Sequence, residues 1–220
     1  AISRARFAEV RKKPTESLDA YEWVLQAAAY YWGNFVPAEH AKVRGALEQA
    51  VQSDPAYADA WAYLADVYLD EYRVNYNPRP DPLDRALNAA RRAASLDRTS
   101  QRAHRVLAEV YFLRHQLDAF FAEVEQAIAL NPSDAETLAS VGHLLNEMGN
   151  ERGISFLRKA MKLDPFLPTI YNLSVALYHF ERREYEKALA VAHKIDIPGN
   201  IFPQLYLAAI YAELGRQSEA

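Results

Sequence analysis

The chain has 220 residues, of which half are apolar, and its 25 basic and 29 acidic side chains give a net charge of -4. Only seven residues are glycine, and no two of them have the spacing of a G-x-G-x-x-G motif or a P-loop, which excludes phosphate-cradling loops of that kind. Cysteine is absent, so disulfides, thiolate metal sites and cysteine nucleophiles are excluded as well.

Residues 1–18 begin the chain with a cluster of basic side chains, whereas the remainder is acidic. We expect a solvated leader helix that joins this domain to something upstream; an arm for nucleic acid or a membrane-surface patch is the alternative. The acidic body is a poor general binder of nucleic acid, and no apolar run reaches the length of a membrane span. Because the chain does not begin with Met and stops inside a helical pattern, the sequence predicts a piece of a longer protein.

Three prolines in matching contexts indicate an internal repeat. Pro55, Pro132 and Pro165 each follow an apolar helical segment and stand five residues after an alanine. The last two are 33 residues apart, and the 77 residues between the first two equal two periods of 34 plus nine. A period of 34 predicts a stack of helical hairpins. Small residues are needed where the helices cross, and the register places there Ala65, Ala86, Ala108, Gly142, Gly153, Ala176, Ala188, Ala208 and Ala220, with Phe120 as the exception.

This register resembles the tetratricopeptide repeat family over residues 19–220. Large apolar residues at the seventh position, mostly aromatic residues at the eleventh, and Gly149 and Gly215 in the turns add to the resemblance. It implies an all-α fold, a right-handed α-solenoid of about five and a half helix hairpins. We expect repeats at about 19–56, 57–100, 101–134, 135–167 and 168–200, and a partial repeat at 201–220.

The second repeat carries the nine extra residues, near residues 71–83 between its two helices. Alternating prolines at 78, 80 and 82 predict an extended, polyproline-like path. The segment is either a proline-rich ligand loop or a stiff connector whose Tyr72 and Tyr76 pack on the adjacent helix pair. We favour the connector.

Three segments, at residues 13–21, 77–83 and 197–199, resemble the repeat tail of bacterial signalling proteins. Those proteins place a class III adenylate/guanylate cyclase domain, or a winged-helix transcription-regulator domain, ahead of the repeats. The resemblance implies a cytoplasmic regulatory or partner-binding module. It implies no cyclase activity for this chain, because no catalytic domain lies within these residues.

The ionisable residues form no recognisable catalytic or metal-binding motif. Six histidines are present, but none forms H-E-x-x-H or pairs with another at helical spacing. His104 and His179 fall on core positions of the repeat, as do Trp61 and Tyr68, so packing explains them better than a ligand site. The sequence therefore predicts no enzyme activity, no cofactor and no metal ion.

In the family that the chain resembles, five positions of each first helix face a concave groove. The family's clamp for a C-terminal carboxylate is absent, because Ala62, Asp66, Val106, Glu136 and Ser140 stand at its positions. The acidic majority of the groove predicts a basic or mixed-charge peptide or helix as partner, unless these residues are only solvated surface. The candidate partner-binding residues are Asp59, Asp66, Asp70, Arg102, Arg105, Glu109, Phe112, Glu136, His143 and Asn146.

The preferred interpretation is a non-catalytic protein-interaction and regulatory module of a larger bacterial signalling protein. One alternative is a self-association module that forms a homodimer through the apolar face of residues 201–220. The other is a sensor for a small ligand, which needs a deep polar pocket.

Overall fold

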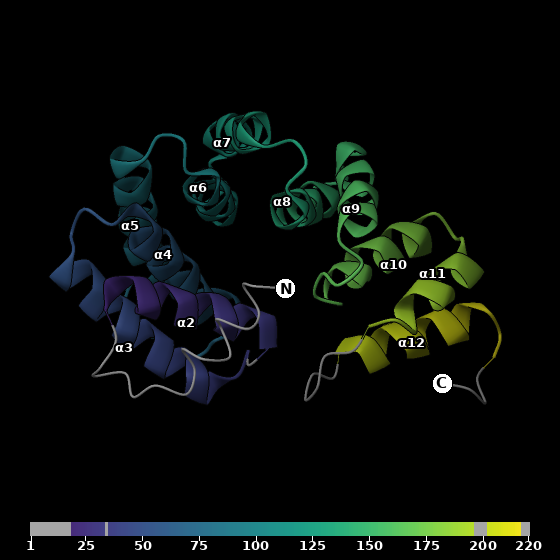
Figure 1. Cartoon of the computed structure of the whole chain (residues 1–220). Coiled ribbons are helices and arrows are strands. Elements are labelled where there is room, and N and C mark those ends of the chain that lie inside the picture. The colour runs from purple at the N-terminus through teal and green to yellow at the C-terminus, as the bar shows by residue number, and fades with distance from the viewer. Residues whose placement is uncertain (1–18, 34, 196–201, 217–220) are drawn as a thin grey trace. The chain divides into compact units, whose positions relative to one another are not determined.

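The computed structural model describes residues 19–33, 35–195 and 202–216, and every regular element in these ranges is a helix (Figure 1). The predicted leader at 1–18 and the 197–199 segment lie outside the described residues. The all-α prediction is confirmed. The eleven helices of the described ranges are α2 (Ala20–Gly33), α3 (Pro37–Ser53), α4 (Ala58–Arg73), α5 (Pro82–Leu96), α6 (Gln101–Leu113), α7 (Leu117–Leu130), α8 (Ala135–Glu147), α9 (Arg152–Leu163), α10 (Tyr171–Glu181), α11 (Tyr185–Ala192) and α12 (Phe202–Glu213).

Helix starts coincide with residues that favour them. Pro37 opens α3 and Pro82 opens α5, where the missing N–H would have no helical partner in any case. At the start of α6, the Ser100 side chain accepts a hydrogen bond from Ala103 N. Local sequence therefore fixes where these helices begin.

Four turns share one backbone feature; three of them join the helices of a hairpin, and the fourth follows α12. His115, Gly149, Arg183 and Gly215 all have positive φ, between 57° and 71°. They follow one another along the chain at intervals of 34, 34 and 32 residues. A left-handed residue of this kind ends a helix by turning the chain away from its axis. The repeat register read from the sequence is thus visible in the backbone of the turns.

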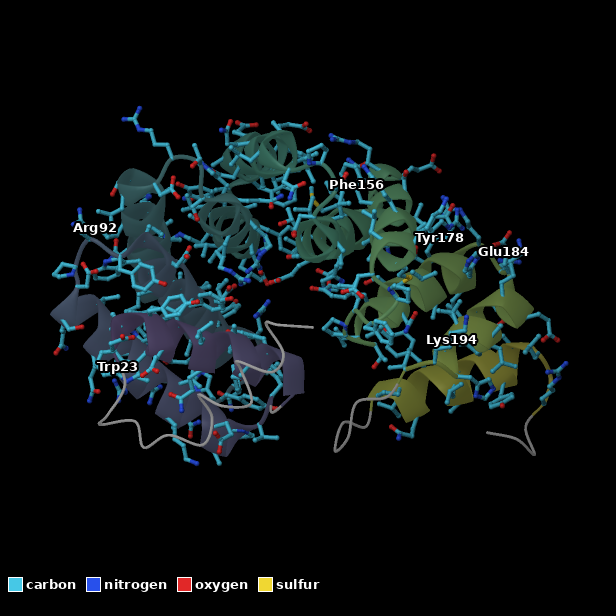
Figure 2. The ribbon with its side chains drawn as sticks, viewed as in Figure 1. Trp23, Arg92, Phe156, Tyr178, Glu184 and Lys194 are labelled. Carbon is cyan, nitrogen blue, oxygen red and sulfur yellow. The ribbon has the colours of Figure 1, made fainter. Side chains whose placement is uncertain are left out.

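The first of two compact units, unit 1, extends to residue 131, and its described helices are α2–α7. Consecutive helices pack as hairpins, and the first helices of the hairpins also pack on one another, since α4 contacts both α2 and α6. Trp23, labelled in Figure 2, belongs to an apolar cluster with Leu47 and Leu64 from the neighbouring helices. Stacking is required because one hairpin alone cannot bury its apolar faces.

Residues 132–220 form the second unit, unit 2, whose described helices are α8–α12. Here α8 pairs with α9, α10 pairs with α11, and α12 packs on α11. The backbones of α8 and α9 touch where small residues were predicted. A Cβ atom added at Gly142 would stand 2.9 Å from Gly153 O, and one at Gly153 would stand 2.4 Å from Asn146 N. No side chain larger than hydrogen fits at these two positions without moving a helix.

The crossing positions of unit 1 show the same rule with alanine. Ala65, Ala86 and Ala108 are fully buried between the helices. Phe120, the exception in the register, is also fully buried, and its ring packs 5.6 Å from that of Phe112. A large aromatic ring therefore fills the crossing in the third hairpin in place of a close approach of backbones.

The extra residues of the second hairpin fall in the 74–81 connector between α4 and α5, as predicted. Its path is not polyproline-like, because Asn75, Asn77 and Asp81 all have positive φ, which a polyproline helix does not contain. The prediction of an extended path is therefore wrong. Prolines restrict only their own φ and their neighbours, and other side chains set the rest of the path.

Asn77 is the main anchor of the connector. Its Nδ2 donates to Pro37 O at 2.6 Å, and its carbonyl oxygen accepts a hydrogen bond from Arg44 Nη1 at 2.7 Å. The Tyr76 ring packs 5.3 Å from that of Phe35. Tyr72 is 51% exposed, so the prediction that it also packs on the neighbouring helix pair is wrong.

The buried carboxylate of Glu71 holds the connector from beneath. It accepts hydrogen bonds from Arg44 Nη1 at 2.9 Å, from Arg85 Nη2 at 2.5 Å and from Arg79 N at 2.7 Å. Burial alone would raise the pKa of Glu71, but these hydrogen bonds hold that pKa below its ordinary value. The contacts favour a fixed connector over a free ligand loop.

Candidate partner-binding face

The first helices of unit 1 bring candidate residues from successive hairpins together. Because α2, α4 and α6 pack in series, side chains about one repeat apart in the sequence can meet. Asp66 on α4 meets Arg102 on α6, which is 36 positions further on, and Tyr31 on α2 meets Asp70 on α4 at a separation of 39. We call the surface over these three helices the first-helix face.

Seven side chains on this face form a continuous series of contacts, which we call the charge ladder. It begins at α2 and ends on α6, and its polar atoms are joined by hydrogen bonds and ion pairs. Its members are Tyr31, Asp66, Asp70, Arg73, Arg102, Arg105 and Glu109.

Each carboxylate of the charge ladder has two partners. Asp70 accepts hydrogen bonds from Tyr31 OH at 2.7 Å and from Arg73 Nη2 at 2.6 Å. Arg73 Nη1 donates to Glu109, whose other oxygen lies 3.6 Å from Arg105 Nη1.

Asp66 completes the ladder. Its Oδ2 accepts hydrogen bonds from Arg105 Nη2 at 2.6 Å and from Arg102 Nη1 at 3.0 Å. The Cζ atom of Arg102 also lies 4.0 Å from the centre of the Tyr63 ring, which is a cation–π contact.

Burial sets the protonation behaviour of Asp70. The side chain is fully buried, and burial raises the pKa of Asp70 to about 6, against the opposing effects of Arg73 and Tyr31. Burial, followed by the charge of Asp70, raises the pKa of the Tyr31 phenol well above its ordinary value. Tyr31 therefore remains a donor at neutral pH.

The count of acidic residues does not describe the charge of this face. Asp66, Asp70 and Glu109 are each paired with at least one of three arginines, Arg73, Arg102 and Arg105. The charge ladder is therefore balanced when all of its carboxylates are ionised. The acidic character predicted for the groove is wrong for this part of it, because a count of residues takes no account of pairing.

The other two candidates in unit 1 occupy different surroundings. Asp59 is exposed in the first turn of α4, seven residues before Asp66 and so on the same side of that helix. Phe112 is half-buried near the end of α6, and its ring contacts Phe120 of α7 within the same hairpin. Asp59 is therefore accessible on the first-helix face, while Phe112 contributes to packing.

In unit 2, two candidates link the first helices α8 and α10. His143 Nδ1 lies 2.6 Å from Ser174 Oγ, and Asn146 Nδ2 donates to Ser174 O at 3.1 Å. His143 Nε2 also lies 3.2 Å from Glu147 Oε1. Glu136, in the first turn of α8, is half-buried. The pattern of unit 1, in which polar side chains join successive first helices, is repeated here without arginine.

Sequence reasoning missed four members of these networks: Tyr31, Tyr63, Arg73 and Ser174. Arg73 is the last residue of α4 and follows the positions that the repeat template assigns to the groove. Tyr31 belongs to the first hairpin, whose first helix received no template positions, so the template does not predict its face. A separation of 31 to 39 residues between polar side chains of successive first helices is the signal that could have found them.

Elsewhere, the histidines expected in the core have carboxylate partners. His104 is half-buried, with Nδ1 2.6 Å from Glu123 Oε2, and this hydrogen bond raises the pKa of His104 despite burial. His179 is buried, with Nδ1 2.5 Å from Glu184 Oε2. Within the described ranges, no group of three His, Asp or Glu side chains could hold a metal ion. None of the described helices is both long and apolar enough to cross a membrane.

Sequence comparison finds one short similarity. A scan against models of known protein families finds no match. A segment of 60 residues is 35% identical to the CTR9 homolog of Arabidopsis thaliana. The matched segment is 27% of this chain and 6% of that protein. The chain thus spans only a small part of this curated relative.

Solved structures are similar over most of the chain. A thermophilic TPR protein of Thermus thermophilus, TTC0263, superimposes with a TM-score of 0.68 at 15% identity, covering 88% of this chain and 99% of that one. The Cut9–Hcn1 hetero-tetramer of the APC/C superimposes with a TM-score of 0.71 at 14% identity, covering 96% of this chain and 40% of that chain. The chain has a tetratricopeptide-repeat (TPR) fold. The human IFIT1 dimer with PPP-AAAA superimposes with a TM-score of 0.74 at 16% identity, covering 92% of this chain and 48% of that chain. At identities this low, the similarity to these structures shows a shared fold and nothing about function.

Proposed function

We propose that this chain is a non-catalytic TPR module that binds a protein or peptide partner on its first-helix face. The candidate residues on this face are the charge ladder with Asp59 and Tyr63; Glu136, His143 and Asn146 of unit 2 form a separate candidate set. The charge ladder is the observation that carries the proposal. It aligns polar side chains of three successive hairpins on one side of the TPR stack.

The energetics of the ladder support a role beyond stability. Buried ion pairs contribute little net stability, because the loss of hydration offsets most of their attraction. Apolar residues at the same positions would stabilise the stack at least as well. A set of fixed, hydrogen-bonded side chains on one face instead suits recognition, since binding does not have to order them.

We further propose that the module belongs to a larger bacterial signalling protein and acts in the cytoplasm. The support is the resemblance of residues 13–21 and 77–83 to the repeat tails of such proteins. The predicted preference for a basic peptide rested on the count of acidic residues, and pairing within the ladder removes that support.

Selection of displayed random peptides on the full chain tests the proposal. We expect binders whose affinity changes severalfold in Asp59→Arg, because Asp59 is exposed on the first-helix face. Arg92→Glu is the matched control, because Arg92 is exposed on α5, a second helix, where Figure 2 labels it. Binders that respond to Arg92→Glu and not to Asp59→Arg would place the binding surface elsewhere and contradict the proposal.

Self-association through α12 is the second candidate. Leu205 is 53% exposed, and Ala209 and Ala212, which follow it at helical spacing, are exposed as well. Such an apolar stripe fits a homodimer interface. Light scattering tests it: a dimer that Leu205→Glu converts to a monomer, while Leu117→Glu on α7 does not, would support this candidate, and a monomeric wild-type chain would exclude it.

A further inference from the structure

Two arginine side chains of the charge ladder are more exposed than its carboxylates. The carboxylate side chains lie at its base, with exposed fractions of 0% for Asp70 and 5% for both Asp66 and Glu109. The side chains of Arg73 and Arg102 are more exposed, at 33% and 21%, whereas that of Arg105 is buried at 8%. A partner that approaches the charge ladder itself therefore meets Arg73 and Arg102 before it meets the ladder's carboxylates.

Both accessible arginines keep a geometry suited to recognition. A guanidinium has five N–H donors, and Arg73 uses two of them on Asp70 and Glu109. The Cζ atom of Arg102 lies 4.0 Å from the centre of the Tyr63 ring, a cation–π contact that restrains the side chain. Planar, fixed guanidinium groups match the geometry of a carboxylate.

The net charge of the ladder also depends on pH. The carboxylate of Asp70 is held where water cannot reach it, and its raised pKa brings partial protonation near pH 6. Loss of that negative charge leaves Arg73 with Glu109 as its ionised partner. The field at the surface of the ladder therefore becomes more positive below neutral pH.

We propose that the first-helix face recognises an acidic segment of its partner, with carboxylates of Asp or Glu side chains bound by Arg73 and Arg102. This inference rests on the proposed function, and it replaces a basic partner with an acidic one. Arg102 contacts Asp66, and Arg73 lies seven residues beyond Asp66 on α4, about 10 Å along the helix axis. Two carboxylates of one extended peptide can span that distance.

The composition of selected peptides is the first test. Random peptides displayed without bias are selected on the full chain, and the wild type is expected to enrich Asp and Glu over the starting library. Enrichment of Lys and Arg, or no change in charge, among binders that respond to Asp59→Arg would overturn this inference and leave the proposed function intact. If no binder responds to Asp59→Arg, the proposed function fails and the inference with it.

A double-mutant cycle is the second test. Arg102→Gln keeps Asp66 paired, because Arg105 Nη2 remains 2.6 Å away, so the variant is expected to fold. We expect this variant to bind an acidic peptide with about tenfold lower affinity, which corresponds to the loss of one charge-assisted hydrogen bond. The same peptide with each Glu replaced by Gln should bind wild type and Arg102→Gln equally.

Arg92→Gln is the control for loss of one positive charge, since Arg92 lies on α5 outside the first-helix face. It should leave the affinity of the acidic peptide unchanged. Arg73→Lys keeps the charge next to Asp70 and Glu109 but removes the planar fork, and we expect it to weaken the acidic peptide severalfold. Equal effects of Arg102→Gln on the Glu and Gln peptides, with circular dichroism showing a folded chain, would overturn the inference.

Discussion

The contact between α8 and α9 makes Gly153→Ala the most direct probe of the packing in this stack. The added Cβ would stand 2.4 Å from Asn146 N, 2.7 Å from Gly142 O and 2.9 Å from Asn146 Cα. All three are backbone atoms, so no side-chain rotation relieves the overlap, and the helices must move apart. Overpacking of this kind destabilises a fold by about 1–3 kcal/mol. The higher helix propensity of alanine offsets about 0.5–1 kcal/mol of that loss. We expect a net destabilisation of about 1–2 kcal/mol.

Gly45→Ala is the matched control for that substitution. Gly45 lies inside α3, and a Cβ added there meets no atom within 4 Å. The same change is therefore expected to stabilise the chain by about 0.5–1 kcal/mol. Urea unfolding followed by circular dichroism measures both variants, and amide exchange in α8 and α9 detects local opening of the stack. A Gly153→Ala variant as stable as wild type would refute the close contact.

Three further predictions concern single residues. Asp70 has a pKa of about 6 in the fold against 3.8 as its ordinary value, so the folded chain binds the Asp70 proton more tightly than the unfolded chain. The wild type should therefore lose about 2 kcal/mol relative to Asp70→Asn between pH 4 and pH 7; parallel stability profiles would contradict this. Asn77→Ala should speed chymotryptic cleavage after Tyr76, because it removes the hydrogen bond to Pro37 O. Asn75→Ala is the control and should not, because Asn75 also has positive φ but makes no side-chain hydrogen bond; equal rates would show that the bond does not hold the connector. Arg183→Gly should raise the free energy of unfolding by about 1 kcal/mol, because Arg183 has a φ of 58° that glycine adopts without strain; a less stable variant in urea unfolding would argue against strain in that turn.

The repeat architecture could be predicted from sequence because side-chain size dictates how closely two helices approach. Gly142 and Gly153 are small for a reason that acts at their own positions, namely the backbone contact between α8 and α9. The left-handed turn residues obey the same local rule, and glycine marks two of the four in the sequence. Information of this kind is present in each repeat and accumulates with the number of repeats.

The pairing within the charge ladder could not be predicted in this way. The template identified Asp66, Asp70 and Glu109 as members of the groove, but it does not say that Arg73 reaches from α4 to α6. That contact depends on the offset between neighbouring hairpins and on the length of one side chain. The sign of the accessible surface therefore emerged only from the structure.

The connector at 74–81 shows the same limit. Its prolines predicted an extended path, whereas the buried Glu71 and the anchor at Asn77 fix a path with three left-handed residues. These partners come from α4 and from the start of α3, outside the segment itself. A local pattern describes a connector poorly when distant side chains hold it.

Amide hydrogen exchange of the full chain, with and without the tightest selected peptide, tests the central claim most directly. Binding on the first-helix face predicts slower exchange at the first helices of unit 1, above all in α4 (Ala58–Arg73) and α6 (Gln101–Leu113). Slower exchange confined to the second helices α5 (Pro82–Leu96) and α7 (Leu117–Leu130), with α4 and α6 unchanged, would contradict the account.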